Sequence, residues 1–233
     1  MKVGIMQPYL FPYLGYFQLI NAVDKFVVYD DVQYMKGGWI NRNRILINGS
    51  VNTFTLRIKK DDFRLNINQR YLVENYQYEN KKILKSIELA YKKATYYDNV
   101  IGLIKDILMY DETNLSKFIT NSIIQICKYL ELDTEIILSS TIEKEHMDDA
   151  QDKVIQVNKL LDADTYINAI GGKELYSKSI FKANGLNLYF IKMNNVTYKQ
   201  FNNEFIPCLS IIDVLMFNSK KSIKELLNQY TLD

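Results

Sequence analysis

The segment from Gln33 to Arg44 concentrates side chains that could bind a ligand. It reads Gln-Tyr-Met-Lys-Gly-Gly-Trp-Ile-Asn-Arg-Asn-Arg and contains the chain's one tryptophan, Trp39. In an extended segment Arg42 and Arg44 project from the same face, where two guanidinium groups can bind phosphate or carboxylate oxygens in a bidentate manner. A hairpin with solvated arginines is the alternative interpretation. The residue types favour an anion site.

Acidic and imidazole side chains supply candidates for proton transfer or metal binding. Asp30 and Asp31 end a predicted strand, where they could hold a metal ion or a ribose hydroxyl, or cap the following turn. His146, the chain's one histidine, lies in the charged run 141–149 and is a candidate general base. No neighbour pairs with it at a recognisable spacing.

A second anion site is predicted near the middle of the carboxyl half. Gly171-Gly172-Lys173 lies between a predicted strand and a predicted helix, as a phosphate-binding loop does. The motif is much shorter than the P-loop and lacks the Ser or Thr that follows its Lys. We therefore interpret it as a half-site for an anion and not as an ATPase signature.

The first twenty residues form the element that would position these groups. An apolar strand ends at Met6, a loop from Gln7 to Tyr13 contains two prolines, and an apolar helix follows from Leu14 to Ile20. A strand that enters a helix through a tight loop places backbone N–H groups and the positive end of the helix dipole at the carboxyl edge of a sheet. Open α/β proteins bind phosphates and nucleotides there.

The remaining chain alternates predicted strands and helices in both halves. An Asn48-Gly49 turn predicts a hairpin over about 45–58. We expect an α/β fold with a mixed or mostly parallel sheet flanked by helices. A single domain would cover 1–233, with a helical insertion at about 81–131 and room for a second lobe at about 150–233. Further strands are predicted at 25–29, 134–139, 164–168 and 186–193, and helices at 81–94, 97–110, 115–130, 151–161, from Gly171 to Tyr176 or beyond, 209–217 and 222–227.

Composition excludes several classes of protein. Lys and Arg number 29 against 27 Asp and Glu, so the net charge of +2 offers no electrostatic case for binding nucleic acid. Cys127 and Cys208 are far apart, which favours a reducing compartment over a disulfide framework, and Cys127 lies in an apolar helix that predicts a buried thiol. No apolar run of about 18 residues occurs, and the first residues lack the pattern of a signal peptide, a basic region followed by an apolar run and a small-residue cleavage site. We expect a cytoplasmic protein without membrane insertion.

Motifs along nearly the whole chain resemble the WbqC-like proteins. The amino-terminal ones are Gln7-Pro-Tyr-x-x-Pro-Tyr-x-Gly15-Tyr-Phe17, Asp31-Val-Gln-Tyr-x-Lys36 and Trp39-Ile-Asn41-Arg42-Asn43-Arg44, and the carboxyl-terminal ones are Tyr166-Ile-x-x-x-Gly171, Leu175-Tyr176, Tyr198-x-Gln200 and Phe205-x-Pro207-x-Leu-Ser210-Ile-x-Asp213. Many members carry a histidine near residue 82 and another shortly after the Tyr-x-Gln. This chain has Lys82 and Asn202-Asn203 there, so a mechanism that depends on those histidines does not transfer.

The resemblance implies an enzyme of bacterial surface-glycan synthesis, because members typically lie in O-antigen, capsule and related glycan gene clusters. We expect it to act on a nucleotide-linked amino sugar and to transfer an acyl or aminoacyl group to the sugar amine. Its partners would be the nucleotide sugar and an acyl or aminoacyl donor, and no cofactor is assigned. An ATP-dependent nucleotidyl- or adenylyl-transferring ligase, with Asp30 and Asp31 binding magnesium, is one alternative. A non-catalytic binding subunit of a glycan-assembly complex is another.

Each candidate residue has a role in this hypothesis. Positively charged side chains would bind the pyrophosphate, and aromatic rings would stack on the base or the sugar. Amide side chains would form hydrogen bonds with sugar hydroxyl groups, and one titratable side chain would be the general base. No metal ligand is assigned. The residues are Arg42, Arg44 and Lys36 for the pyrophosphate, Tyr9, Tyr13 and Trp39 for stacking, Gln7, Asn41 and Gln200 for hydroxyls, and Asp31, Asp213 or His146 as the base.

Overall fold

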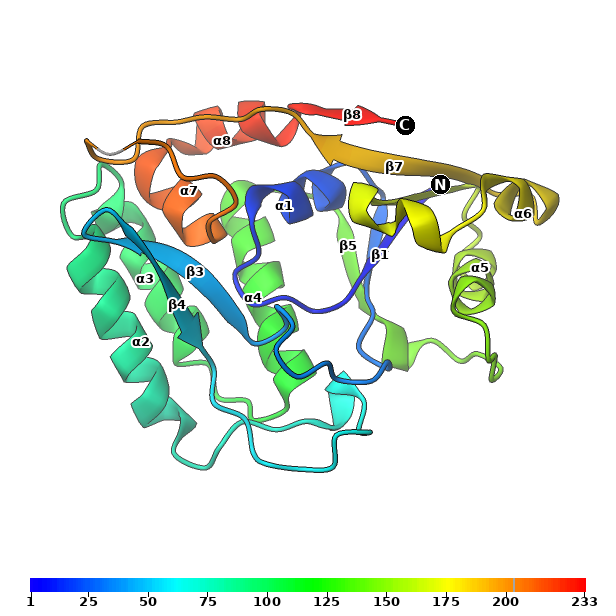
Figure 1. Ribbon diagram of the computed structural model, residues 1–233, viewed down its shortest axis with the longest axis horizontal. Helices are drawn as coiled ribbons and strands as arrows, with labels where there is room; N and C mark the ends of the chain where they lie inside the picture. The colour runs from blue at the N-terminus through cyan, green and yellow to red at the C-terminus, as the bar shows by residue number, and fades with distance from the viewer. Residues whose placement is uncertain (203) are drawn as a thin grey trace.

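The computed structural model describes residues 1–202 and 204–233, and its centre is a six-stranded sheet (Figure 1). The strand order is β5-β2-β1-β6-β7-β8, and every neighbouring pair is parallel except β7 and β8. The α/β fold with a mostly parallel sheet flanked by helices is therefore confirmed. The strands are β1 (Lys2–Met6), β2 (Lys25–Val28), β5 (Glu135–Leu138), β6 (Thr165–Ala169), β7 (Asn187–Met193) and β8 (Tyr230–Leu232).

Strand β1 lies in the middle of the sheet and marks the point where the strand order reverses. The chain passes from β1 to β2 and on to β5 in one direction, then crosses back to β6 on the other side of β1 and continues to β7. Neighbouring strands whose connections leave in opposite directions splay apart at their carboxyl ends and leave a crevice there, the topological switch point. In this protein that crevice lies at the ends of β1 and β6.

Helices cover both faces of the sheet. Successive side chains of a strand point to opposite faces, so a strand buried on both sides is apolar throughout. Phe26 and Val28 of β2 join the cluster that contains α1 (Leu14–Asn21), α4 (Leu115–Leu130) and α8 (Lys220–Leu227). Val27 joins the opposite cluster, which contains α5 (Ala150–Leu160) and α6 (Lys178–Ala183). This alternation explains the uninterrupted apolar runs of the parallel strands.

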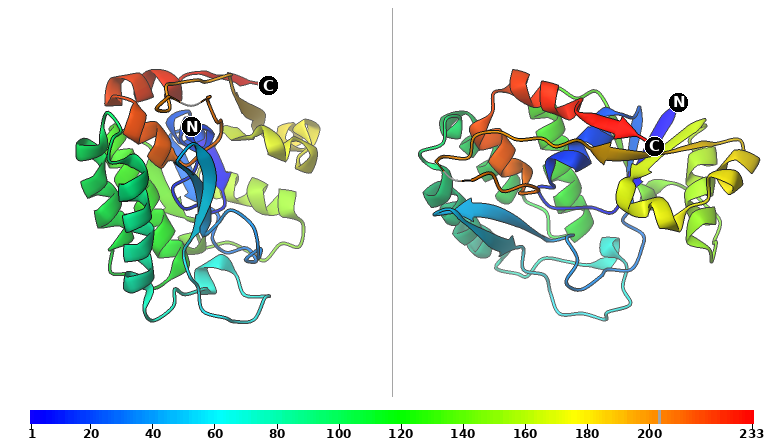
Figure 2. Two further views of the ribbon diagram at one scale, coloured as in Figure 1. Left: turned by 60° about the vertical axis from the view of Figure 1, so that its left-hand side comes forward. Right: turned by 45° about the horizontal axis from the view of Figure 1, so that its top comes forward.

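A hairpin and helices lie between β2 and β5 in the chain. The hairpin of β3 (Arg42–Ile47) and β4 (Ser50–Thr55) is a separate antiparallel sheet, and Figure 2 shows it beside the helical layer. Helices α2 (Tyr76–Tyr91) and α3 (Tyr97–Leu108) pack together and precede α4. The helix predicted at 81–94 begins earlier than expected. Asn80 is buried and its Nδ2 donates to the Leu108 carbonyl oxygen at 2.8 Å, so a tertiary contact extends a polar first turn.

Two carboxyl-terminal helices also differ from expectation. Gly171 to Lys173 lies in a short 3₁₀ helix, η3 (Ile170–Leu175), and α6 begins separately after the extended residue Tyr176. Glycine weakens an α-helix, which fits the short tight turn. The helix predicted from 209 is α7 (Ile211–Phe217), because the Ser210 side chain accepts a hydrogen bond from the Ile212 N–H and caps its start.

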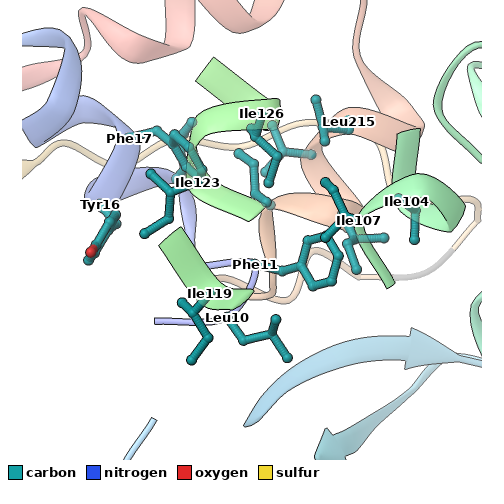
Figure 3. Close-up of a cluster of buried hydrophobic side chains, with 14 of the residues drawn as sticks. Leu10, Phe11, Tyr16, Phe17, Ile104, Ile107, Ile119, Ile123, Ile126 and Leu215 are labelled. Carbon is teal, nitrogen blue, oxygen red and sulfur yellow. The ribbon is translucent and has the colours of Figure 1, made fainter. Parts of the chain in front are cut away.

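The core extends into the loop that follows β1. Leu10 and Phe11 are fully buried, and Figure 3 shows them packed near side chains of α3, α4 and α7, among them Ile107, Ile119 and Leu215. A loop that buries two large apolar side chains is anchored as firmly as a helix or strand. Among the described residues, no helix is both long and apolar enough to cross a membrane.

The two cysteines are free and differ in reactivity. Cys127 is buried, as predicted, and burial raises the pKa of its thiol to about 12, whereas Cys208 is exposed. Because the thiolate is the reactive form, we expect one thiol per chain to react rapidly with a disulfide reagent in native protein and two after denaturation. Absorbance titration with such a reagent measures both numbers, and two rapid thiols in the native protein would contradict the packing around Cys127.

Candidate functional site

A cleft of about 850 Å³ opens at the carboxyl ends of β1 and β6. This volume lies within the range of small-molecule sites, roughly 300–1,000 Å³. The lining is mostly aromatic and aliphatic, and among its described residues Lys192 is the one charged side chain, with no Asp, Glu, His or Cys. The lining residues of interest are Gln7, Tyr9, Tyr13, Gly15, Tyr29, Met35, Gly38, Trp39, Asn168, Gly171, Gly172, Tyr176 and Lys192.

Hydrogen bonds from two distant segments fix the 7–13 loop. Asn43 Nδ2 donates to the Leu10 carbonyl oxygen at 3.0 Å and also to that of Phe11, which Ser210 Oγ contacts at 2.8 Å. Phe11 has a φ of 44°, a left-handed conformation that costs a non-glycine residue about 1–3 kcal/mol and concentrates at functional sites. Hydrogen bonds from β3 and from the N-cap of α7 keep Phe11 in this conformation. In the loop that they fix, Tyr9 and Tyr13 line the cleft.

Replacing Asn43 tests this anchoring. Asn43→Ala would leave two buried carbonyl oxygens without its amide, so we expect a loss of about 2–3 kcal/mol in the free energy of unfolding, measured by urea denaturation. Asn52→Ala, in an exposed position of β4, is the matched control and should change stability by less than about 0.5 kcal/mol. Equal stabilities for the two variants would contradict the role assigned to Asn43.

Arginines and aromatic rings form one cluster, here called the arginine–aromatic cluster. Its rings, Tyr9, Tyr13 and Trp39, line the cleft, whereas Arg42 and Arg44 are outside the described lining and contact it through Trp39. The guanidinium carbons of Arg42 and Arg44 each lie 5.1 Å from the centroid of the Trp39 ring. That ring is 6.2 Å from Tyr9, which is 6.5 Å from Tyr13. Cation–π contacts of this kind orient guanidinium groups without neutralising them. The cluster combines stacking surfaces with positive charge.

No carboxylate neutralises these arginines within the described part of the chain. Arg44 Nη2 donates to the Cys208 carbonyl oxygen at 3.2 Å, and Arg42 donates to the carbonyl oxygen of Gly37. Neither arginine forms a salt bridge to a described residue, although many lysines of this protein do. Burial raises the pKa of Tyr9 despite the nearby charge of Arg44, so its ring stays neutral. Positive charge without a protein counterion favours an anionic ligand.

The second predicted anion site is only partly in the cleft. Gly171 and Gly172 line it, but Lys173 does not, because its ammonium group forms an ion pair with Asp233. Asn168, which the sequence analysis did not single out, lines the cleft beside these glycines and is 6% exposed. A polar residue at the carboxyl end of a predicted parallel strand is the signal that could have identified it.

Asp213 and Gln200 lie outside the described lining, in a buried network. Asp213 accepts hydrogen bonds from the hydroxyl groups of Tyr91 and Tyr198, each at 2.8 Å, and from Gln200 Nε2 at 2.7 Å. Burial raises the pKa of Asp213, and these hydrogen bonds partly oppose that rise. The Tyr91 hydroxyl also accepts from the Leu46 N–H at 3.0 Å. The network joins α2, β3 and α7 behind the cleft.

Asp31 lies next to the cleft. Its Oδ2 pairs with Lys144 Nζ at 2.6 Å, while its Oδ1 is buried and has no hydrogen-bond partner among the described residues. Tyr29 lines the cleft, and its pKa is raised to about 12 by burial and by the charge of Asp31. The carboxylate of Asp31 is therefore electrostatically coupled to a side chain in the cleft.

Asp30 differs from its neighbour because it is fully hydrogen-bonded. Its oxygens accept from Ser116 Oγ at 2.8 Å and from Ser140 N and Oγ at 2.9 and 2.8 Å. The pair therefore does not present two open carboxylates on one side. Among residues 1–202 and 204–233, no three His, Cys, Asp or Glu side chains are grouped so that they could hold a metal ion.

The remaining candidates lie outside the described lining as well. His146 is exposed, and its Nε2 is 3.2 Å from Asp148 Oδ1. Asn41 is buried, accepts from the Tyr34 hydroxyl at 2.9 Å and donates to the Leu56 carbonyl oxygen at 2.8 Å, so its amide supports the segment that carries Trp39. Lys36 is exposed beside Met35, which lines the cleft.

The fold is that of an open α/β protein with a cleft at its topological switch point. The chain belongs to the WbqC-like protein family, whose model matches residues 7–225. It is also similar to the uncharacterized protein Rv1507c of Mycobacterium tuberculosis, with 28% identity over 220 residues that cover 93% of each chain. No solved structure significantly matches this chain. Family membership thus confirms the resemblance of the motifs.

Proposed function

We propose that this protein is an enzyme of bacterial surface-glycan synthesis that acts on a nucleotide-linked amino sugar and transfers an acyl or aminoacyl group to the sugar amine. The observation that carries the proposal is the arginine–aromatic cluster at the switch-point cleft. There Arg42 and Arg44 stack on Trp39 and have no carboxylate partner among the described residues. Membership of the WbqC-like family supports the same class of substrate.

The chemistry of the cleft suits a nucleotide sugar. A diphosphate carries two negative charges, which Arg42 and Arg44 can bind through bidentate hydrogen bonds, with Lys36 nearby in the chain. The nucleobase and the sugar ring can stack on Tyr9, Tyr13 and Trp39. The absence of carboxylates from the described lining removes the repulsion that such an anion would otherwise meet. Gln7 would read hydroxyl groups, and the backbone N–H groups of Gly171 and Gly172 would bind an oxygen of the ligand.

The transfer step requires the sugar amine to be unprotonated. Its nitrogen lone pair forms a bond to the acyl carbon of the donor, the bond from that carbon to the leaving group breaks, and the leaving group takes the electron pair. The attacking nitrogen then gives up a proton to a base. Of the three candidates, Asp31 is the one whose charge raises the pKa of a lining side chain, that of Tyr29, so we assign the base to Asp31.

A thermal-shift screen tests the proposal directly. Purified protein is heated with UDP- and dTDP-amino sugars, ATP with magnesium, acyl-CoA or glycine. A ligand at 100 times its Kd stabilises the native state by about 2.7 kcal/mol, which for a chain of this length raises Tm by roughly 5–10 °C. We expect stabilisation by a nucleotide amino sugar. Stabilisation by ATP alone would replace the proposal with a ligase, and no response to any compound would favour a binding subunit.

A further inference from the structure

Asn168 presents an unused hydrogen-bond donor to the cleft. It is 6% exposed, lines the cleft, and its Oδ1 accepts a hydrogen bond from the Ala169 N–H at 2.8 Å. That bond fixes which side of the amide faces the backbone, so Nδ2 points the other way. No described residue accepts a hydrogen bond from Nδ2. Nδ2 is not among the fully buried side-chain atoms that lack a partner, so it reaches the open space of the cleft. A ligand acceptor can bind this donor there.

Gly172 makes room for this amide. A Cβ atom at Gly172 would lie 2.4 Å from Asn168 Nδ2, which is closer than the two atoms can approach, and 3.2 Å from Asn168 Cγ, which is a tight contact. A Cβ at the adjacent Gly171 would meet no atom within 4 Å. The absence of a side chain at residue 172 therefore allows Asn168 to occupy its position, and the pair forms a built feature of the cleft.

Asn168 and the arginine–aromatic cluster occupy different parts of the cleft. Residue 168 is in β6 and follows Ile167, which pairs with Gly4 of β1, so Asn168 lies beside the carboxyl end of β1. The ring and cation–π contacts of Trp39 and Tyr9 involve residues 13, 16, 42 and 44, and among the described residues none involves β6 or η3. A ligand that fills the cleft can contact both parts at once.

We propose that Asn168 Nδ2 donates a hydrogen bond to an oxygen of the sugar in the bound nucleotide sugar, which makes Asn168 a specificity-determining residue. This inference rests on the proposed function, which places the diphosphate and base at the arginine–aromatic cluster. A nucleotide held there directs its sugar to the β6 end of the cleft. The acceptor is a sugar hydroxyl or an acylamido carbonyl oxygen, and Gln7 lines the same cleft and carries a second amide.

Isothermal titration of wild-type protein and Asn168→Asp tests the inference. The probes are UDP-N-acetylglucosamine, UDP-glucosamine and a dTDP-4-amino sugar, together with UDP and dTDP. In Asn168→Asp the new carboxylate still accepts from the Ala169 N–H but no longer has the Nδ2 donor. Its added charge repels the diphosphate, and this repulsion is the same for a free nucleotide and a nucleotide sugar. We therefore expect the affinity ratio of nucleotide sugar to free nucleotide to fall at least tenfold. Asn168→Ser, which is neutral, should lower the same ratio.

Gly172→Ala supplies an independent variant because it displaces the Asn168 amide without changing that residue. We expect it to lower the ratio as Asn168→Asp does, whereas Gly171→Ala keeps its backbone N–H, adds a methyl group in open space and should lower it less. Thermal unfolding of each variant distinguishes a local effect from misfolding.

The outcomes separate this inference from the proposed function. If wild-type protein binds nucleotide sugars and the Asn168 variants leave the ratio unchanged, the role of Asn168 is wrong and the proposed function stands. If wild-type protein binds none of the five probes, both are overturned. An equal loss of affinity for free nucleotide and nucleotide sugar in Asn168→Ser would also contradict the inference, because it would place Asn168 at the nucleotide and not at the sugar.

Discussion

Replacing Arg42 and Arg44 together by alanine is expected to weaken the binding of a nucleotide sugar by about 100-fold or more. Each arginine can form charge-assisted hydrogen bonds worth about 1.5–3 kcal/mol, and every 1.4 kcal/mol is a factor of ten in Kd. Both side chains also pack on Trp39, so the double variant removes charge and disorders one stacking surface. Isothermal titration with UDP- and dTDP-amino sugars measures the effect.

The matched control for this variant is Arg64→Ala. Arg64 is an exposed arginine that pairs with Asp62 at 2.6 Å and has no contact with Trp39, so its loss changes the net charge without touching the cluster. We expect less than a twofold change in Kd. If the double variant binds as tightly as the control, the diphosphate does not bind at Arg42 and Arg44, and the assignment of this part of the cleft is wrong.

Asp213→Ala is expected to lower the free energy of unfolding by about 3 kcal/mol or more, since the donors on Tyr91, Tyr198 and Gln200 would lose their shared acceptor. For a chain of this length that loss corresponds to a fall in Tm of roughly 6–12 °C. Asp106→Asn, at an exposed position of α3, is the control and should be neutral within about 0.5 kcal/mol. A variant of Asp213 as stable as wild type would show that the network contributes nothing to the fold.

The stabilising effect of Asp213 should also depend on pH. Burial raises its pKa in the folded protein above the ordinary value of 3.8, so the native state keeps a proton at pH values where the unfolded chain has lost it. The stability contributed by this linkage is complete below the unfolded pKa and is lost as pH rises through the folded pKa. We therefore expect the stability difference between wild type and Asp213→Ala to decrease from pH 4 upwards. An increase over that range would contradict the raised pKa.

The parallel strands could be predicted from sequence because their burial on both faces makes each of them a short apolar run. The prediction at 134–139 matches β5 (Glu135–Leu138), and that at 164–168 matches β6 (Thr165–Ala169) to within a residue at each end. Strand β8 was missed. Its residues Tyr230–Leu232 are half polar and form a strand only because β7 offers an open edge to pair with.

The candidate site was predicted in part. Residue type and spacing alone indicated a site that combines aromatic rings with arginines. The structure brings Tyr9, Tyr13, Trp39 and both arginines together in the arginine–aromatic cluster. Lys173 forms an ion pair with Asp233, sixty residues away along the chain, a contact that no local pattern reveals. Gln200 and Asp213 likewise appear as two polar residues of a motif, and their mutual hydrogen bond removes both from the described lining of the cleft.

The sequence by itself determined the fold class, the stiff loop after β1 and the residue types of the arginine–aromatic cluster, because local periodicity, proline geometry and side-chain chemistry are properties of neighbouring residues. Tertiary structure decided where the cleft lies and which candidates line it. The pairing of β6 with β1 creates the switch point and places Asn168 in the cleft, and strand order depends on contacts between residues more than a hundred and sixty positions apart. Hydrogen bonds from Asn43 and Ser210 to the loop carbonyl oxygens hold the left-handed Phe11 in place, so the geometry of the cleft also depends on tertiary contacts.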